Sequence, residues 1–142
     1  MATPAWNVLG DIITCKVSGK ETGGAFALFE VDSPAGNGPP PHIHHREDET
    51  FYILSGNVEF TTQGKTIRLG PGGSLFAPRN VAHSFRSVGP AKMLLIATPA
   101  GLEHFFAELD REIGPRPPEM PKLVAILGRH GIELVGPPPQ PK

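Results

Sequence analysis

The sequence predicts an all-β fold, either a sandwich or a small barrel, followed by two short C-terminal helices. Two observations lead to this prediction. The chain of 142 residues contains 17 glycines and 17 prolines, which is typical of many short strands joined by tight connections. After Pro99 the spacing of apolar residues changes from that of strands to that of helices. The length favours one domain, with a barrel over residues 1–100 and a packed helical extension over 101–142.

Seven runs before Pro99 have the length and composition of β-strands, because they alternate or are rich in aromatic and β-branched residues. Glycine, proline, asparagine and serine separate the runs, and the breaks SGN and TQGK have the size of hairpin turns. Short strands at this spacing indicate a sandwich or a small barrel. The runs cover residues 24–31, 49–55, 57–62, 65–70, 73–78, 82–87 and 91–98.

Two segments beyond the predicted barrel have helical spacing. Apolar side chains in residues 101–114 recur every three or four positions, and a Gly-Pro pair ends the helix. Residues 121–134 predict a second helix that ends near Gly128 or Gly131. The tail GPPPQPK is expected to be extended. Because helices this short are not stable alone, we expect 101–113 and 121–131 to pack outside the barrel or across its mouth, burying Phe105, Phe106, Leu109 and Ile126.

The composition argues against several classes of function. Thirteen basic and fourteen acidic residues nearly cancel, and no basic block is present, so nucleic acid is not expected as a partner. The first residues lack the features of a signal peptide, and the longest apolar run is too short to cross a membrane. The only cysteine, Cys15, excludes an intramolecular disulfide and is expected to be buried. We therefore expect a soluble, cytoplasmic protein without a membrane partner.

The stretch PPPHIHHREDETFYILSG places three of the six histidines within four positions. Alternate side chains of a strand share a face, so His42 and His44 point to one side, and the triple proline before them holds the chain extended. Glu49 is in phase with the apolar side chains of the next strand, and His83 with those of a later strand. Four groups that can bind metals are therefore expected to enter one apolar interior.

A carboxylate and three imidazoles in a dry interior are costly unless a partner such as a divalent cation satisfies them. Imidazole nitrogen and carboxylate oxygen suit iron, manganese, nickel, copper or zinc. Each residue taken singly has an ordinary structural explanation, and it is the joint pattern that favours a metal site. Glu47, in phase with Glu49, is an alternative ligand or a supporting carboxylate. His45 is out of phase and is expected to support the ligands or to face solvent.

These residues resemble the two motifs of the cupin superfamily. The first motif is matched throughout, by Gly36, His42, His44, Glu49 and Gly56. The resemblance implies a double-stranded β-helix of the cupin, or jelly-roll, type and a metal site formed by these histidines and the glutamate.

The second cupin motif is matched with two departures. Gly72, Pro78 and His83 stand at the usual positions. Asn80 stands where glycine is usual, and asparagine is the best substitute for glycine in a left-handed turn. Ser87 stands where asparagine is usual, which leaves the expected ligand in place.

A narrower resemblance connects the histidine-rich stretch and the C-terminal helices to bacterial quercetin 2,3-dioxygenase-like cupins. It implies one divalent transition metal ion, with His42, His44 and His83 as plain ligands. Glu49 would be both a ligand and the catalytic base that takes the proton of a flavonol before O2 cleaves the ring. The resemblance also implies a homodimer. Alternation suggests a substrate pocket lined by Phe51, Ile53, Phe60, Phe76, Phe85 and Met93.

The leading hypothesis is a metal-dependent, dioxygenase-like enzyme that acts on a small aromatic or enol substrate, because three imidazoles and one carboxylate leave coordination positions open. Two alternatives stay open at this point. One is a non-redox cupin, an isomerase or hydrolase in which the metal is only a Lewis acid. The other is a module that binds a small molecule without turning it over.

Overall fold

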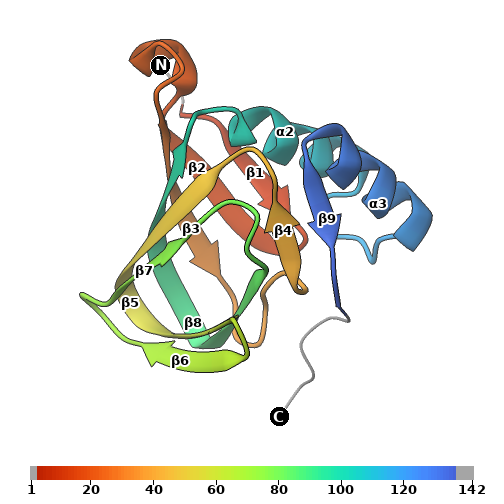
Figure 1. Ribbon diagram of the computed structural model, residues 1–142. Coiled ribbons are helices and arrows are strands. Elements are labelled where there is room, and N and C mark those ends of the chain that lie inside the picture. The colour runs from red at the N-terminus through yellow and green to blue at the C-terminus, as the bar shows by residue number, and fades with distance from the viewer. Residues whose placement is uncertain (1–2, 137–142) are drawn as a thin grey trace.

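The computed structural model describes residues 3–136, so the predicted extended tail after Gly136 lies outside the described residues. The described chain forms one nine-stranded sheet in which every paired strand is antiparallel to its neighbour. The sheet curls into a jelly-roll barrel (Figure 1). Its elements are β1 (Ala5–Val8), β2 (Asp11–Val17), α1 (Gly19–Thr22), β3 (Ala27–Ser33), β4 (His42–His44), β5 (Asp48–Thr62), β6 (Lys65–Leu69), β7 (Ser74–Ala77), β8 (His83–Thr98), α2 (Leu102–Glu112), α3 (Met120–Arg129) and β9 (Ile132–Leu134).

The two longest strands, β5 and β8, pair with each other along nearly their whole length and thereby join the two halves of the barrel. The first part of β5 lies against the last part of β8, beside β3, and the second part lies against the first part of β8, near β4. The predicted hairpin at SGN is therefore wrong, because the chain bends there and continues as one strand. Gly56 has φ 79°, and a Cβ at this position would lie 2.3 Å from the Pro90 carbonyl oxygen. Only glycine fits this bend. The other predicted break, TQGK, is the β5–β6 hairpin.

The core lies between the walls of the barrel and follows the alternation of the strands. On β3 every second side chain is buried, and Phe29 and Val31 stand opposite Leu95 and Met93 of β8. Cys15 is buried on β2, as predicted. The rings of Phe51, Phe60 and Phe85 contact one another at centroid distances of 5.0 to 6.0 Å.

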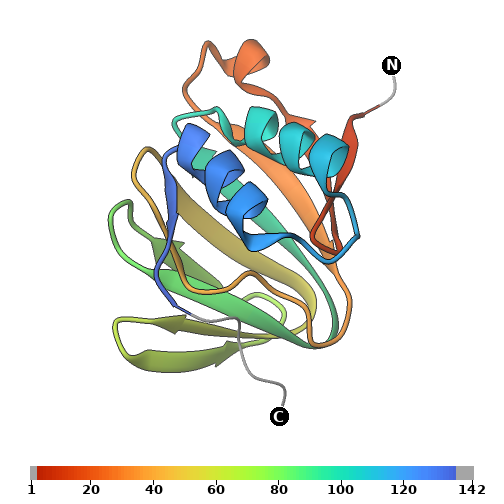
Figure 2. The same cartoon turned by 90° about the vertical axis from the view of Figure 1, so that its right-hand side faces the viewer.

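The helices α2 and α3 lie side by side across one opening of the barrel (Figure 2). Phe106 packs edge-on against Phe29, at a centroid distance of 5.1 Å, which fixes α2 to β3. The four apolar residues predicted to be buried are all less than 7% exposed, because each amphipathic helix turns its apolar face to the barrel. Those residues are Phe105, Phe106, Leu109 and Ile126. None of the helices in residues 3–136 is long and apolar enough to cross a membrane.

The second C-terminal helix ends within the predicted range, between Gly128 and Gly131. It ends at Arg129, the chain turns at Gly131 with φ 72°, and residues 132–134 form the unpredicted strand β9. The partner of β9 is β4, where Ile132 stands opposite His44. The strand that carries two predicted metal ligands is therefore held by β8 on one edge and by the C-terminal extension on the other.

Candidate metal centre

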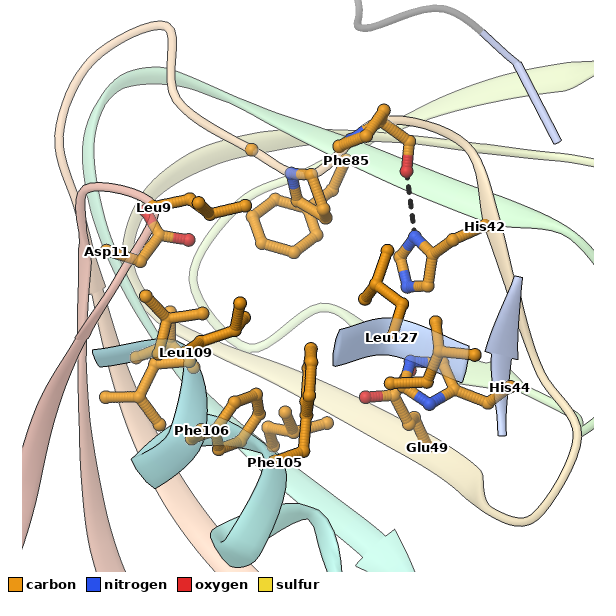
Figure 3. A pocket seen from close by; sticks show the side chains of 18 of the residues that line it. Leu9, Asp11, His42, His44, Glu49, Phe85, Phe105, Phe106, Leu109 and Leu127 are labelled. Carbon is orange, nitrogen blue, oxygen red and sulfur yellow. Dashed lines mark hydrogen bonds and ion pairs between the residues drawn. The ribbon is translucent and has the colours of Figure 1, made fainter. Parts of the chain in front are cut away.

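Three strands bring the four predicted ligands together inside the barrel. His42 and His44 lie on β4, Glu49 lies near the start of β5, and His83 begins β8 directly opposite His42. One candidate ligand atom from each of the four residues lies within 4.8 Å of the others, and all four residues are buried. Figure 3 shows His42, His44 and Glu49 on one wall of a cavity. The strand alternation therefore places the side chains as the sequence indicates.

Hydrogen bonds orient two of the imidazoles. His42 Nδ1 lies 2.8 Å from the carbonyl oxygen of Pro40, so Nδ1 is the donor and Nε2 is left as a possible ligand. His44 Nδ1 lies 3.3 Å from Glu47 Oε1, and its Nε2 faces Glu49. Metal-binding histidines commonly donate their second N–H to a carboxylate or a carbonyl in this way, because it fixes the orientation of the ring.

Buried polar atoms at the centre lack hydrogen-bonding partners. Glu49 Oε1 lies 2.9 Å from His83 Nε2 and 3.2 Å from His44 Nε2. Glu49 Oε1 and both ring nitrogens of His83 nevertheless have no aligned hydrogen bond. Unpaired buried groups of this kind are costly, whereas ligands that aim at a common ion need not aim at one another. The residues therefore fit a bound divalent cation.

The electrostatics of the cluster favour the metal-binding protonation states of Glu49 and His42, and they oppose that of His44. Burial raises the pKa of Glu49, but the imidazoles of His44, His83 and His42 outweigh it and lower the pKa to about 2. Burial lowers the pKa of His42 to about 3, and the other two imidazoles add to this effect. Burial also acts to lower the pKa of His44, but the carboxylates of Glu49 and Glu47 outweigh it and raise this pKa. At pH 7 Glu49 is therefore an anion and His42 is neutral, as metal binding requires.

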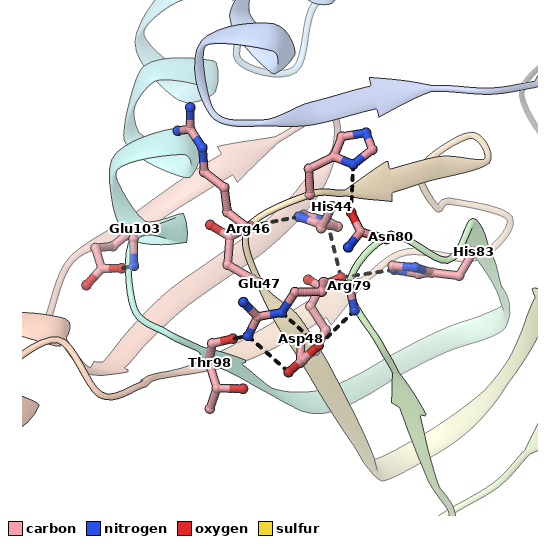
Figure 4. A network of polar contacts seen from close by, with 12 residues as sticks. His44, Arg46, Glu47, Asp48, Arg79, Asn80, His83, Thr98 and Glu103 are labelled. Atoms are coloured by element: carbon pink, nitrogen blue, oxygen red, sulfur yellow. Dashed lines mark hydrogen bonds and ion pairs between the residues drawn. The ribbon is translucent and has the colours of Figure 1, made fainter.

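Of the two roles that the sequence left open for Glu47, the structure supports the second. Its side chain is buried and contacts the far ring nitrogen of His44, outside the group of four converging ligand atoms. The exposed imidazole of His45 instead has its ring nitrogens 2.8 Å from Asn80 Oδ1 and 3.0 Å from Glu133 Oε1. Figure 4 shows the polar contacts around His44, Glu47, Asn80 and His83. Asn80 adopts the left-handed conformation, with φ 67°, which explains why it can replace glycine.

A cavity of about 100 Å³ adjoins the candidate ligands. Its walls combine strands of the barrel with the apolar faces of α2 and α3 and with β9. We call α2, α3 and β9 the roof of the cavity. We did not predict from the sequence that the roof contributes pocket residues, although the helical spacing of its apolar side chains was visible there. Its lining includes Phe105, Phe106, Leu109, Leu123, Leu127 and Ile132.

The six residues predicted to line a substrate pocket divide into three groups. Phe51 and Phe85 line the cavity. Ile53, Phe60 and Met93 are fully buried in the barrel core, outside the lining of this cavity.

Phe76 is 59% exposed, so its expected place in the pocket is wrong. In the β5–β7 register Ala77 stands opposite Glu49, whereas Phe76 stands opposite Thr50. Residues paired across strands share a face, so Phe76 is directed outward.

Asp11 also lines the cavity, on the wall opposite the candidate ligands, and it was not singled out in the sequence (Figure 3). It is in phase with the buried residues Ile13 and Cys15 of β2, and this phase was a signal that it faces inward.

An antiparallel barrel with a buried set of three imidazoles and one carboxylate defines a class of candidate metal-binding β-barrel proteins. Residues 29–98 match the family model of the cupin domain. The structure is similar to that of KdgF from Halomonas sp., with a TM-score of 0.61 and 22% identity, over 67% of this chain and 84% of the other. The protein is a small cupin, and the predicted jelly-roll fold is confirmed.

Two curated relatives are similar over part of their length. The chain is 36% identical over 91 residues to quercetin 2,3-dioxygenase of Bacillus subtilis (strain 168), a match that covers 63% of this chain and 27% of the relative. It is 36% identical over 80 residues to the dimethylsulfoniopropionate lyase DddQ of Ruegeria pomeroyi, which covers 56% of this chain and 39% of the relative. The chain therefore spans well under half the length of either relative.

Proposed function

We propose that this cupin is a metal-dependent, dioxygenase-like enzyme that acts on a small enol or aromatic substrate. The observation that carries the proposal is the buried set of Glu49 Oε1 and the two His83 ring nitrogens, which make no aligned hydrogen bond with any described residue and lie beside an apolar cavity. His42, His44, His83 and Glu49 would hold one divalent transition metal ion. Such an ion supplies an open coordination position that polarises an enol oxygen and, where the metal is redox-active, exchanges electrons with O2.

The cavity sets a scale for the substrate. Its volume of about 100 Å³ is comparable to the roughly 150 Å³ apolar cavity that holds benzene. A single-ring molecule matches this scale, whereas a three-ring flavonol is larger. The apolar walls contributed by Phe51, Phe85 and the helices favour an aromatic or enol body. We therefore propose a one-ring enol in preference to a flavonol.

Glu49 has two proposed roles, metal ligand and catalytic base, and its pKa bears differently on each. A carboxylate with a pKa of about 2 is ionised at neutral pH, as a metal ligand must be, but it is a weak base. It suits a substrate whose proton is acidic, such as the hydroxyl proton of an enol. The role as catalytic base is thus proposed only together with an enol substrate.

A non-redox reaction is the second candidate, because the chain is also 36% identical, over a shorter match, to a relative named as a lyase. In that case the metal would act only as a Lewis acid, and product would form without loss of O2. A binding module without turnover would bind the enol tightly and release it unchanged.

The decisive experiment combines metal analysis with oxygen uptake. We expect the purified protein to contain about one transition metal ion per chain, and His44→Ala to lose it. His45→Ala is the matched control, because it removes the adjacent, exposed imidazole and should keep the metal. Oxygen consumption that depends on a one-ring enol would support the dioxygenase. Equal metal content in the two variants would overturn the metal site, and product formation without O2 loss would favour the lyase-like reaction.

The homodimer expected from the resemblance stays a prediction, and sedimentation velocity of the purified protein tests it.

A further inference from the structure

A buried carboxylate stands in the cavity wall away from the candidate metal ligands. Asp11 begins β2 and is 5% exposed. Its neighbours in the lining include Leu9 and Leu109, and Figure 3 shows the Asp11 side chain facing the cavity on the side opposite His42 and Glu49. Asp11 and Glu49 are the only acidic residues among the described residues that line this cavity. The two ends of the cavity are therefore each marked by a carboxylate.

Two hydrogen bonds hold Asp11 through one of its oxygens. Oδ1 accepts from the Ser33 hydroxyl at 2.7 Å and from Asn37 Nδ2 at 2.6 Å. Asn37 Nδ2 also lies 3.2 Å from the carbonyl oxygen of Leu9, so three segments of the chain fix the carboxylate. Among residues 3–136, Oδ2 accepts no hydrogen bond, and no ion pair involves Asp11. Asp11 Oδ2 is therefore a fixed hydrogen-bond acceptor at the cavity wall, without a partner among these residues.

A purely structural role does not account for a carboxylate here. Anchoring Ser33 and Asn37 needs one oxygen, which an asparagine side chain would provide without a buried charge. Burial raises the pKa of Asp11, and the hydrogen bonds from Asn37 and Ser33 offset only part of this effect. A buried carboxylate with no ion-pair partner and with one oxygen free of hydrogen bonds is costly, and such costs are typical of groups that bind a ligand.

We propose that Asp11 is a second recognition point for the substrate, where Oδ2 accepts a hydrogen bond from a hydroxyl at the end of the molecule remote from the metal centre. This inference rests on the proposed function, because it takes the other end of the substrate to be the enol. A hydroxyl fits better than an ammonium group. It has one hydrogen to donate, whereas an ammonium has three, and the wall around Asp11 has no second carboxylate to accept them.

Three one-ring probes test the proposal by binding alone. They are a hydroxypyranone chelator, the same ring with a hydroxymethyl group on the side remote from the chelating oxygens, and the methyl ether of that compound. Titration calorimetry on zinc-loaded protein measures affinity without oxidation, and the bound zinc is measured after each titration. We expect the hydroxymethyl compound to bind roughly tenfold to a hundredfold more tightly than its methyl ether, which cannot donate.

Asp11→Asn is the informative variant, because its carbonyl oxygen can still accept from Ser33 and Asn37 while an NH2 group replaces Oδ2. That NH2 can donate to the methyl ether, so the preference for the hydroxyl should fall to less than about threefold or reverse. Asp32→Asn is the matched control, since Asp32 is exposed and lies one residue before Ser33. It should keep the full preference, and both variants should keep their zinc.

The outcomes separate this inference from the proposed function. Equal affinity of the wild type for the hydroxymethyl compound and its ether would overturn the role of Asp11 while the enol site stands. An unchanged preference in Asp11→Asn would do the same. If Asp11→Asn does not fold, the comparison of probes on the wild type decides alone. Zinc-loaded protein that binds none of the probes would overturn both the proposed function and the role of Asp11.

Discussion

Glu47→Gln tests whether the carboxylate behind His44 supports the metal centre. Glu47 is 5% exposed, and its Oε1 lies 3.3 Å from His44 Nδ1, on the side of the ring away from Glu49. The substitution keeps the size of the side chain and an oxygen that can accept a hydrogen bond, but it removes the negative charge. The ring of His44 then loses a partner that makes its other nitrogen a better ligand.

The size of the effect follows from the geometry. Loss of such a partner typically costs about 10- to 100-fold in metal affinity. The distance of 3.3 Å is at the long end for a hydrogen bond, and the glutamine still accepts, so we expect the lower end of this range. We therefore expect about tenfold weaker zinc binding, or about 1.4 kcal/mol.

The effect should also depend on pH, with a sign that the structure determines. Glu49 and Glu47 raise the pKa of His44, so a proton competes with the metal more strongly in the wild type. Without the charge of Glu47 this pKa falls and the competition weakens. The difference in affinity between wild type and Glu47→Gln should therefore be largest at high pH and shrink as the pH falls through the titration of His44. Competition with a chromophoric chelator measures both quantities.

Glu133→Gln is the matched control for Glu47→Gln. Glu133 Oε1 lies 3.0 Å from His45 Nε2, so the same kind of pair is changed one residue along the chain, but both side chains are about half exposed and point away from the centre. We expect unchanged zinc affinity. The reasoning is refuted if Glu47→Gln weakens zinc binding less than twofold, or if Glu133→Gln weakens it equally.

Three further predictions concern stability. Leu127→Ala shortens a buried side chain of α3 and should lower the free energy of unfolding, measured by urea titration, by about 2–4 kcal/mol. Val124→Ala, on the exposed face of the same helix, is the control and should change this free energy by less than about 0.5 kcal/mol. Hydrogen bonds from Arg129 and His130 lower the pKa of Glu108 to about 2, so its stabilising effect is complete above the ordinary pKa of glutamate and is lost as the pH falls toward 2. Glu108→Gln should remove this part of the acid dependence, and identical acid-unfolding curves for the two proteins would contradict it. Zinc added to metal-stripped protein at a free concentration of about 100 times its Kd should stabilise the fold by about 2.7 kcal/mol, measured by calorimetry, and an unchanged Tm would argue against a specific site.

Reasoning from local sequence failed at two places, the bend at SGN and the direction of the Phe76 side chain. A Ser-Gly-Asn break fits a hairpin as well as a bend, and only the long pairing of β5 with β8 decides between them. The run Leu75-Phe76-Ala77 is apolar at three successive positions, so alternation alone does not decide whether Phe76 or its two neighbours face the interior. The pairing of Ala77 with Glu49 selects the phase in which Phe76 is exposed.

The sequence by itself determined the strand-rich barrel, the two amphipathic helices and the phase of His42, His44, Glu49 and His83. It did so because strand and helix periodicities are properties of the local backbone, and the apolar neighbours of each ligand mark the inward face. Only the tertiary structure decided that α2, α3 and β9 cover the cavity and that β9 pairs with β4. It also decided that Asp11 lies in the cavity wall opposite the candidate metal ligands. These features depend on contacts between residues distant along the chain, such as Asp11 with Ser33, and local periodicity carries no information about such contacts.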